Sequence, residues 1–134
     1  KIENKQIASF SMEAVINQEF KTITDKNLEG QWTIMYFFPY AFENSSCATL
    51  KCLNENMTSN VAVIGVSTDS HYAHLAWIKS FGKDFKIPIA SDLSTKVTQS
   101  FDILDDGHSK NCAFIISPNK LISYFVEFPL KIDS

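Results

Sequence analysis

The segment VIGVSTDSHYAHLAWIKS, residues 63–80, decides the fold class. Residues 61–66 are apolar throughout, which is typical of a strand buried on both faces of a sheet. Asp69 and Ser70 follow, and both are residue types that cap the first turn of a helix. The apolar spacing over residues 71–81 then predicts that helix. The segment therefore indicates a buried strand followed by a crossover helix.

The same signals recur on both sides of this segment. Short runs of β-branched and aromatic residues predict strands at residues 33–38, 113–116 and 121–128, and helical spacing of apolar residues predicts helices at 47–57 and 94–101. Strand and helix alternate first, as in an α/β sheet with crossover helices. The last two strands flank a tight turn at residues 117–120, which indicates an antiparallel hairpin. We therefore expect an α/β domain with a mixed sheet.

Size and charge limit the function classes. The chain has 134 residues and 45% hydrophobic content, which predicts a single domain over residues 1–134. The formal net charge of -3 comes without a basic run, so we expect no nucleic-acid partner. No apolar stretch approaches the about 20 residues of a membrane helix, so we expect no membrane partner and a cytoplasmic location. Three cysteines in a domain of this size favour reduced thiols over a disulfide framework.

Three segments carry a family resemblance: residues 63–80, KIPIASDLSTKVTQSFDIL at 86–104 and AFIISPNKLISYFVE at 113–127. They closely resemble the alkyl hydroperoxide reductase C/thiol-specific antioxidant family of peroxiredoxins, over about residues 10–130. The resemblance implies a thioredoxin-like fold, with a central mixed β-sheet flanked by helices. It also implies a peroxidase that reduces hydrogen peroxide and organic hydroperoxides through a cysteine, with no cofactor.

The resemblance implies partners as well. A thioredoxin-like protein or a flavoprotein disulfide reductase would supply electrons, and the chain would self-associate into homodimers or rings. The sequence lacks the final helix and the C-terminal resolving cysteine of the typical two-cysteine branch. We therefore expect a piece of a longer protein.

The family motif P-x-x-x-[ST]-x-x-C has its nearest match in PYAFENSSC, residues 39–47. A gapless alignment from the proline places Glu43 on the Ser/Thr position and Ser46 on the cysteine position. A one-residue insertion instead brings Cys47 into register, with Asn44 at the Ser/Thr position. Both alignments stay open, and the resemblance makes Cys47 the candidate peroxidatic nucleophile.

The remaining site residues come from the same resemblance. Pro39 and Phe42 would line the pocket, and Thr49 would give polar support together with Asn44. Where the family has an arginine beside the thiolate, this chain has Asn111, with Lys110 adjacent. An amide supplies no positive charge, so we expect reduced peroxidase power. A cysteine in the first turn of a helix would still be favoured as thiolate by the helix dipole.

Two other cysteines have weaker signals. Cys52 lies five residues after Cys47, a spacing that matches the intrahelical resolving pair of bacterioferritin comigratory protein-type peroxiredoxins. Residues five apart point about 140° apart on a helix, so a bridge requires local unwinding. We favour a small buried apolar role for Cys52, with the resolving thiol as the alternative. Cys112 precedes an apolar strand, and we expect it in the core.

The histidines give no metal signal. His71 and His74 stand three apart without a third ligand at a recognisable spacing, so we expect capping and packing roles and no metal site. His108 lies in the polar stretch LDDGHSK, which indicates a solvated loop.

Two further function classes compete with the peroxidase. The changes at the motif's conserved positions also fit a degenerate peroxiredoxin fold that serves as an interaction or assembly module. A disulfide reductase is disfavoured, because thioredoxin-type activity uses C-x-x-C and this chain has four residues between Cys47 and Cys52.

Overall fold

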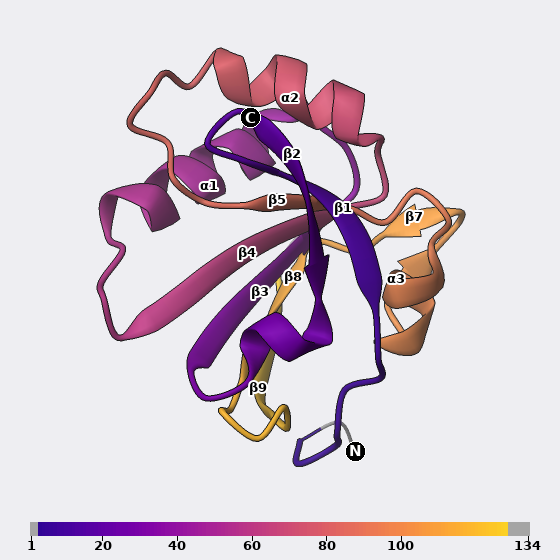
Figure 1. Ribbon diagram of the computed structural model, residues 1–134. Helices are drawn as coiled ribbons and strands as arrows, with labels where there is room; N and C mark the ends of the chain where they lie inside the picture. Colours follow the sequence, from indigo (N-terminus) through magenta and orange to yellow (C-terminus); the bar gives the residue numbers. More distant parts are fainter. Residues whose placement is uncertain (1–2, 129–134) are drawn as a thin grey trace.

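The computed structural model describes residues 3–128, which form a seven-stranded sheet with helices on both faces (Figure 1). In chain order the elements are β1 (Ser11–Ile16), β2 (Glu19–Thr24), the 3-10 helix η1 (Asp25–Leu28), β3 (Trp32–Phe38), α1 (Asn44–Glu55), β4 (Val61–Ser67), α2 (His71–Lys79), β5 (Ile89–Ser91), α3 (Lys96–Ser100), β6 (Leu104–Asp105), β7 (His108–Ser109), β8 (Cys112–Ile116) and β9 (Ile122–Glu127). The predicted α/β class is confirmed.

The sheet is mixed, in the order β2-β1-β5-β4-β3-β8-β9. β3, β4 and β5 pair in parallel, whereas the outer neighbours pair antiparallel. The predicted hairpin between β8 and β9 is confirmed, and its turn is closed by the Ser117 N–H, which donates to the Leu121 carbonyl at 2.8 Å. Parallel pairing requires crossovers, and α1 and α2 supply them between β3, β4 and β5.

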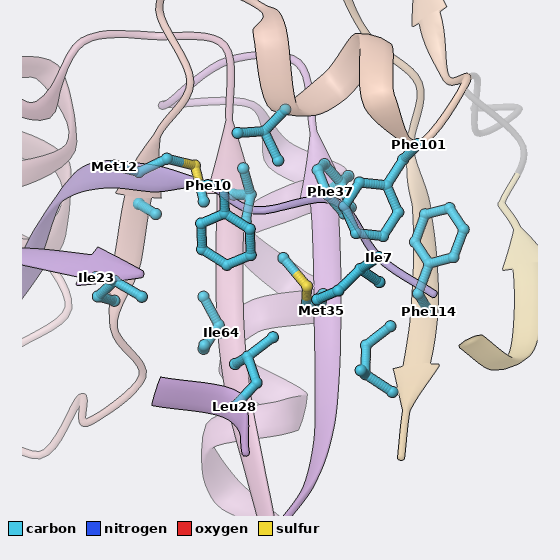
Figure 2. Close-up of a cluster of buried hydrophobic side chains, with 14 of the residues drawn as sticks. Ile7, Phe10, Met12, Ile23, Leu28, Met35, Phe37, Ile64, Phe101 and Phe114 are labelled. Atoms are coloured by element: carbon cyan, nitrogen blue, oxygen red, sulfur yellow. The ribbon is translucent and has the colours of Figure 1, made fainter. Parts of the chain in front are cut away.

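Side chains of β3 alternate between two buried clusters, one on each face of the sheet. Met35 and Phe37 point to the first cluster, where Figure 2 shows them near Met12 of β1, Leu28 of η1 and Phe101, which directly follows α3. Tyr36 and Phe38 point to the second, which α1 and α2 cover and to which α1 contributes Leu50. Because both faces are covered, the strand is apolar from Ile34 to Phe38, and this is why it could be predicted.

Several element boundaries differ from the predicted ones. α1 begins three residues before the predicted start, because the polar residues 44–46 form its first turn. α3 covers only Lys96–Ser100. β1, β2 and β5 were not predicted at all. β2 is exposed at most positions, so it lacks the apolar pattern that marks a strand.

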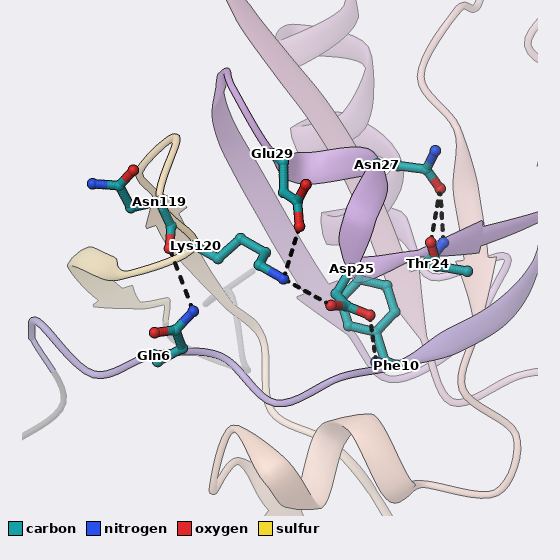
Figure 3. Close-up of polar contacts among 8 residues, drawn as sticks. All are labelled: Gln6, Phe10, Thr24, Asp25, Asn27, Glu29, Asn119 and Lys120. Carbon is teal, nitrogen blue, oxygen red and sulfur yellow. Dashed lines mark hydrogen bonds and ion pairs between the residues drawn. The ribbon is translucent and has the colours of Figure 1, made fainter.

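Ion pairs join the β8–β9 turn to the 3-10 helix η1 and the residue that follows it. The Lys120 ammonium, in the β8–β9 turn, lies 3.0 Å from the Asp25 carboxylate and 3.2 Å from that of Glu29 (Figure 3). Asp25 also accepts a 3.0 Å hydrogen bond from the Phe10 N–H. Residues far apart in sequence are thus fixed to each other at the start of β3.

Candidate active site

The first turn of α1 follows β3 through a short loop. Glu43 has an extended backbone and forms the N-cap, and the Cys47 N–H donates to the Glu43 carbonyl at 2.9 Å. Cys47 is therefore the fourth residue of α1, at the end of the first turn rather than at the helix start. Its thiol is half-buried and packs against the cluster under α1 and α2.

Ser46, rather than Cys47, points into the interior. It is fully buried, with 0% of its surface exposed, and its hydroxyl donates a 2.6 Å hydrogen bond to the Glu43 carboxylate. The gapless alignment places these two residues on the motif's Ser/Thr position (Glu43) and cysteine position (Ser46). Asn44 takes the Ser/Thr position in the alternative alignment, in which Cys47 takes the cysteine position, and Asn44 is exposed.

Ser46 belongs to a polar cluster beneath α1, made by the buried Tyr36, Ser46 and Asn111 and the half-buried Thr49. Burial raises the pKa of the Tyr36 hydroxyl, and the charge of Glu43 adds to this rise. The side chains of Ser46, Thr49 and Asn111 oppose it. Asn111 directly precedes β8, whose pairing with β3 sets Tyr36 opposite Ala113. The structure therefore brings together three of the predicted site residues: Ser46, Thr49 and Asn111.

Sequence reasoning missed Tyr36, and it placed Glu43 on a motif position without giving this residue a role. Tyr36 lay hidden in the apolar run of β3, although strict alternation along that strand would have placed it under α1. Glu43 stands where a helix start needs a cap, but glutamate is not a favoured N-cap residue. Its contribution comes from its side chain, which holds the Ser46 hydroxyl.

Other predicted pocket residues lie outside this cluster. Pro39 is buried, and its carbonyl accepts a 2.8 Å hydrogen bond from the Thr68 hydroxyl. Phe42 is 62% exposed and lies against Trp77, with ring centroids 6.2 Å apart, so it does not close off the buried cluster. Lys110, which stands next to Asn111 in the sequence, has its ammonium 4.0 Å from the Glu127 carboxylate.

The three cysteines have different surroundings. Cys52 is exposed, so the favoured prediction of a buried apolar role is wrong. It lies about 200° around α1 from the buried Leu50 and therefore faces away from the core. Cys112 is fully buried, as predicted, and burial raises the pKa of its thiol to about 12, with the Glu127 charge adding to the rise and Lys110 opposing it.

The histidines of α2 have structural roles. His74 is fully buried and its Nε2 forms a hydrogen bond with the Ser67 hydroxyl, which confirms the packing prediction. Burial lowers its pKa to about 4, against the opposing charge of Asp69. The Ser70 hydroxyl caps the helix by accepting from the Ala73 N–H at 3.1 Å.

His108 differs from its prediction. It lies in β7, is partly buried, and packs on Tyr40 with ring centroids 5.0 Å apart, so the expected solvated loop is wrong. Among residues 3–128, no group of three or more His, Cys, Asp or Glu side chains could hold a metal ion. Within the same part of the chain, no helix is both long and apolar enough to span a membrane.

Comparison with known proteins identifies the family. The model of the AhpC/TSA family matches residues 4–125. The chain belongs to this family.

Alkyl hydroperoxide reductase C of Bacillus subtilis is 34% identical over 126 residues, which cover 88% of this chain and 67% of that protein. The probable peroxiredoxin prdx-3 of Caenorhabditis elegans is 31% identical, over 88% of this chain and 57% of that protein. The mitochondrial thioredoxin-dependent peroxide reductase of Homo sapiens is 31% identical, over 86% of this chain and 49% of that protein.

Solved AhpC/TSA structures share the whole described architecture. Enterococcus faecalis AhpC, at 26% identity, has a TM-score of 0.87 over 100% of this chain and 85% of its own. The reduced 2-Cys peroxiredoxin of Plasmodium vivax, at 23% identity, has a TM-score of 0.89 over 100% and 90% of the two chains and supports the fold alone. The predicted thioredoxin-like fold is confirmed.

The chain spans about half to two thirds of the length of these curated relatives. Residues 129 and 130, to which we extended the resemblance, and the last residues of the predicted 1–134 domain lie outside the described residues.

Proposed function

We propose that this chain is a thiol-dependent peroxidase that reduces hydrogen peroxide and organic hydroperoxides through Cys47. Membership of the AhpC/TSA family supports the reaction class, since its relatives are named as peroxiredoxins and peroxide reductases. The observation that carries the assignment to Cys47 is its position. It is a half-buried thiol in the first turn of α1, next to the buried polar cluster.

The chemistry is nucleophilic substitution at oxygen. The Cys47 thiolate attacks one peroxide oxygen, so that an S–O bond forms while the O–O bond breaks. The leaving hydroxide or alkoxide takes up a proton and departs as water or alcohol, and the sulfur is oxidised by two electrons to a sulfenic acid. A second thiol then forms a disulfide with release of water.

Cys52 is the candidate resolving thiol. It is exposed on α1 and therefore accessible to a sulfenic acid at Cys47 once the helix locally unwinds. A dithiol reductant of the thioredoxin-like or flavoprotein disulfide reductase class would then regenerate both thiols. We place the reaction in the cytoplasm, with neither nucleic acid nor a membrane as partner.

A homodimer completes the proposal. β9 lies at one edge of the sheet and pairs only with β8 among the described strands. The free edge of β9 can pair antiparallel with β9 of a second copy of this chain, which extends the sheet across the two chains.

One observation favours the second candidate, a degenerate fold without peroxidase activity. The buried Ser46 and its partner Glu43 occupy the two motif positions of the gapless alignment, and Asn111 replaces the cation. A serine hydroxyl cannot cycle through a sulfenic acid. The fold would then serve as an interaction or assembly module.

The two candidates differ in one measurement. The reduced protein is mixed with stoichiometric hydrogen peroxide, sulfenic acid is trapped within seconds, and the modified residue is located by peptide mass spectrometry. Rapid modification confined to Cys47, lost in Cys47→Ser, supports the peroxidase. A Cys52→Ser variant is the matched control, because it should keep the sulfenic acid and lose only the subsequent disulfide. Slow oxidation of Cys47 and Cys52 at equal rates would instead support the degenerate fold.

A further inference from the structure

The C-terminal half of α1 is the part of this helix that is least attached to the domain. In the first two turns, the side chains of Ser46 and Leu50 are fully buried. Beyond them, residues 51–56 are exposed except for Leu53 and Asn54, which are half-buried. Helices open from their ends, and an end that buries little surface opens at the lowest free-energy cost. The last turns of α1 should therefore open before the rest of the helix.

The side chain of Asn54 ties these last turns to another part of the fold. Its amide nitrogen donates to the Asp84 carbonyl at 3.0 Å, and its oxygen accepts from the Lys86 N–H at 2.8 Å. We call these two hydrogen bonds the Asn54 link. A side-chain amide can donate and accept at once, so one residue satisfies both backbone groups. Figure 1 shows the connection between α2 and β5, which carries residues 84–86, passing beside α1.

The connection between α2 and β5 is a firm anchor for this link. Phe85 and Ile87, on either side of Lys86, are 6% and 2% exposed and belong to the buried cluster under α1 and α2. The backbone of residues 84–86 is thus held in place by its own side chains and does not follow α1 when the helix opens. Opening of the last turns therefore breaks both hydrogen bonds of the Asn54 link.

The other polar side chains of the last turns are attached more weakly. The Lys51 ammonium lies 5.6 Å from the centroid of the Phe81 ring, and a cation–π contact of an exposed lysine is weak. The Asn56 amide donates to the Cys52 carbonyl at 2.8 Å, a contact inside α1 that opens with the helix. Within the described part of the chain, Asn54 makes the only side-chain hydrogen bonds between this half of α1 and another segment.

Opening of the last turns affects the two cysteines of α1. Cys47 and Cys52 are five residues apart, so they point about 140° apart on an intact helix and form a disulfide only after the helix opens. Cys47 stays with the first turns, which Ser46 and Leu50 bury. Cys52 belongs to the half that opens at lower cost. The motion that brings the two thiols together is therefore the opening that the Asn54 link opposes.

We propose that the Asn54 link holds the last turns of α1 closed and thereby limits the rate at which Cys47 and Cys52 form a disulfide. The physiological meaning of that disulfide rests on the resolving role proposed above for Cys52, whereas the opening of α1 does not. Asn54 touches neither thiol and acts through the position of Cys52, so it is a positioning residue.

Asn54→Ala tests the first part of the proposal. Alanine has a higher helix propensity than asparagine, so more frequent opening in this variant must come from the lost hydrogen bonds. Native-state hydrogen exchange should become roughly tenfold faster at the amides of residues 52–55, as expected for two lost hydrogen bonds, and stay unchanged in β3. Glu55→Ala is the matched control, because Glu55 is exposed on the same turn, and it should not accelerate exchange. Unchanged exchange in α1, or equal acceleration in β3, would overturn the proposal.

Oxidation by diamide, a diazene that oxidises thiols, tests the second part. Cys47 and Cys52 together give two electrons and two protons to its N=N bond, which becomes a hydrazine, while one S–S bond forms. The rate of disulfide formation, followed by peptide mass spectrometry, should rise roughly tenfold in Asn54→Ala, by the same factor as the opening. Asn54→Asp keeps the oxygen that accepts from Lys86 and loses the donor to Asp84, so its rate should be intermediate.

Failure of this proposal differs from failure of the proposed function. A diamide-driven rate that does not change in Asn54→Ala, although α1 opens faster, would overturn the control of the disulfide by the Asn54 link. If hydrogen peroxide fails to oxidise Cys47, the proposed peroxidase is wrong. A faster diamide-driven disulfide in Asn54→Ala would still support the Asn54 link in that case, because diamide requires no peroxidase activity.

Discussion

The Ser46 hydroxyl donates a 2.6 Å hydrogen bond to the carboxylate of Glu43, three residues earlier at the N-cap of α1. The pair fixes the entrance of the helix over the buried polar cluster. It also keeps a negative charge at the positive end of the helix dipole, which is favourable. Cys47 is the next residue of the same helical turn.

Ser46→Ala should therefore destabilise the protein by roughly 1.5–3 kcal/mol, because it removes a buried hydrogen bond to a charged group. Urea denaturation measures the loss. Ser45→Ala, one residue earlier and only half-buried, is the control and should change the free energy of unfolding by less than about 0.5 kcal/mol. Equal effects at both positions would show that the Ser46–Glu43 contact contributes nothing specific.

His74 should make stability depend on pH. Burial lowers its pKa in the folded chain to about 4 from an ordinary value of 6.5. Between these values the unfolded chain binds a proton that the folded chain does not, so the free energy of unfolding falls as pH decreases from 6.5 toward 4. The loss amounts to as much as about 3 kcal/mol, and denaturation at several pH values measures it.

A His74→Gln variant should flatten this pH profile even if it is less stable throughout. His71→Gln, on the same helix but partly exposed, should leave the slope in place. A slope that persists unchanged in His74→Gln would assign the pH dependence to other groups.

The three cysteines should differ in their reactivity toward an alkylating reagent. Burial raises the pKa of Cys112 to about 12, so at pH 8 almost none of it is thiolate, whereas Cys47 and Cys52 are both accessible. Iodoacetamide should modify Cys47 and Cys52 in the native protein and Cys112 only in denaturant. Peptide mass spectrometry locates the labels, and native labelling of Cys112 as fast as that of Cys52 would refute its burial.

The sheet was the most predictable part of the fold. β3 and β4 are apolar at nearly every position because both of their faces are buried, and the turn at residues 117–120 has the composition of a hairpin. β1 and β2 were not predictable in the same way. β1 buries Met12, Ala14 and Val15, but the small Ala14 and the charged Glu13 between them weaken its apolar signal. β2 is exposed at most positions and has no such signal.

The candidate site was predictable only in part. The motif located the loop and the start of α1, but two alignments competed for Ser46 and Cys47. Burial decides which side chain faces inward, and the rotation of α1 over the sheet determines that burial. The neighbourhood of Tyr36 and Asn111 depends on the pairing of β3 with β8, a contact between residues 75 positions apart in sequence that no local pattern encodes.

The ion pair between Lys120 and Asp25 gives the last prediction. Asp25 is buried; this desolvation would raise the pKa of its carboxyl group, but the Phe10 N–H and the Lys120 ammonium together hold that pKa below its usual value of 3.8. Asp25→Asn removes the charge and should destabilise the protein by roughly 1–3 kcal/mol, since it leaves a partly buried ammonium with weaker partners. Glu29→Gln is the control, because the Glu29 side chain is 55% exposed and its ion pair is screened by solvent. Urea denaturation at low and high salt should show a large, nearly salt-independent loss of unfolding free energy for Asp25→Asn and a small, salt-sensitive loss for Glu29→Gln. The reverse order would mean that the exposed Lys120–Glu29 pair contributes most of the stability between η1 and the β8–β9 turn.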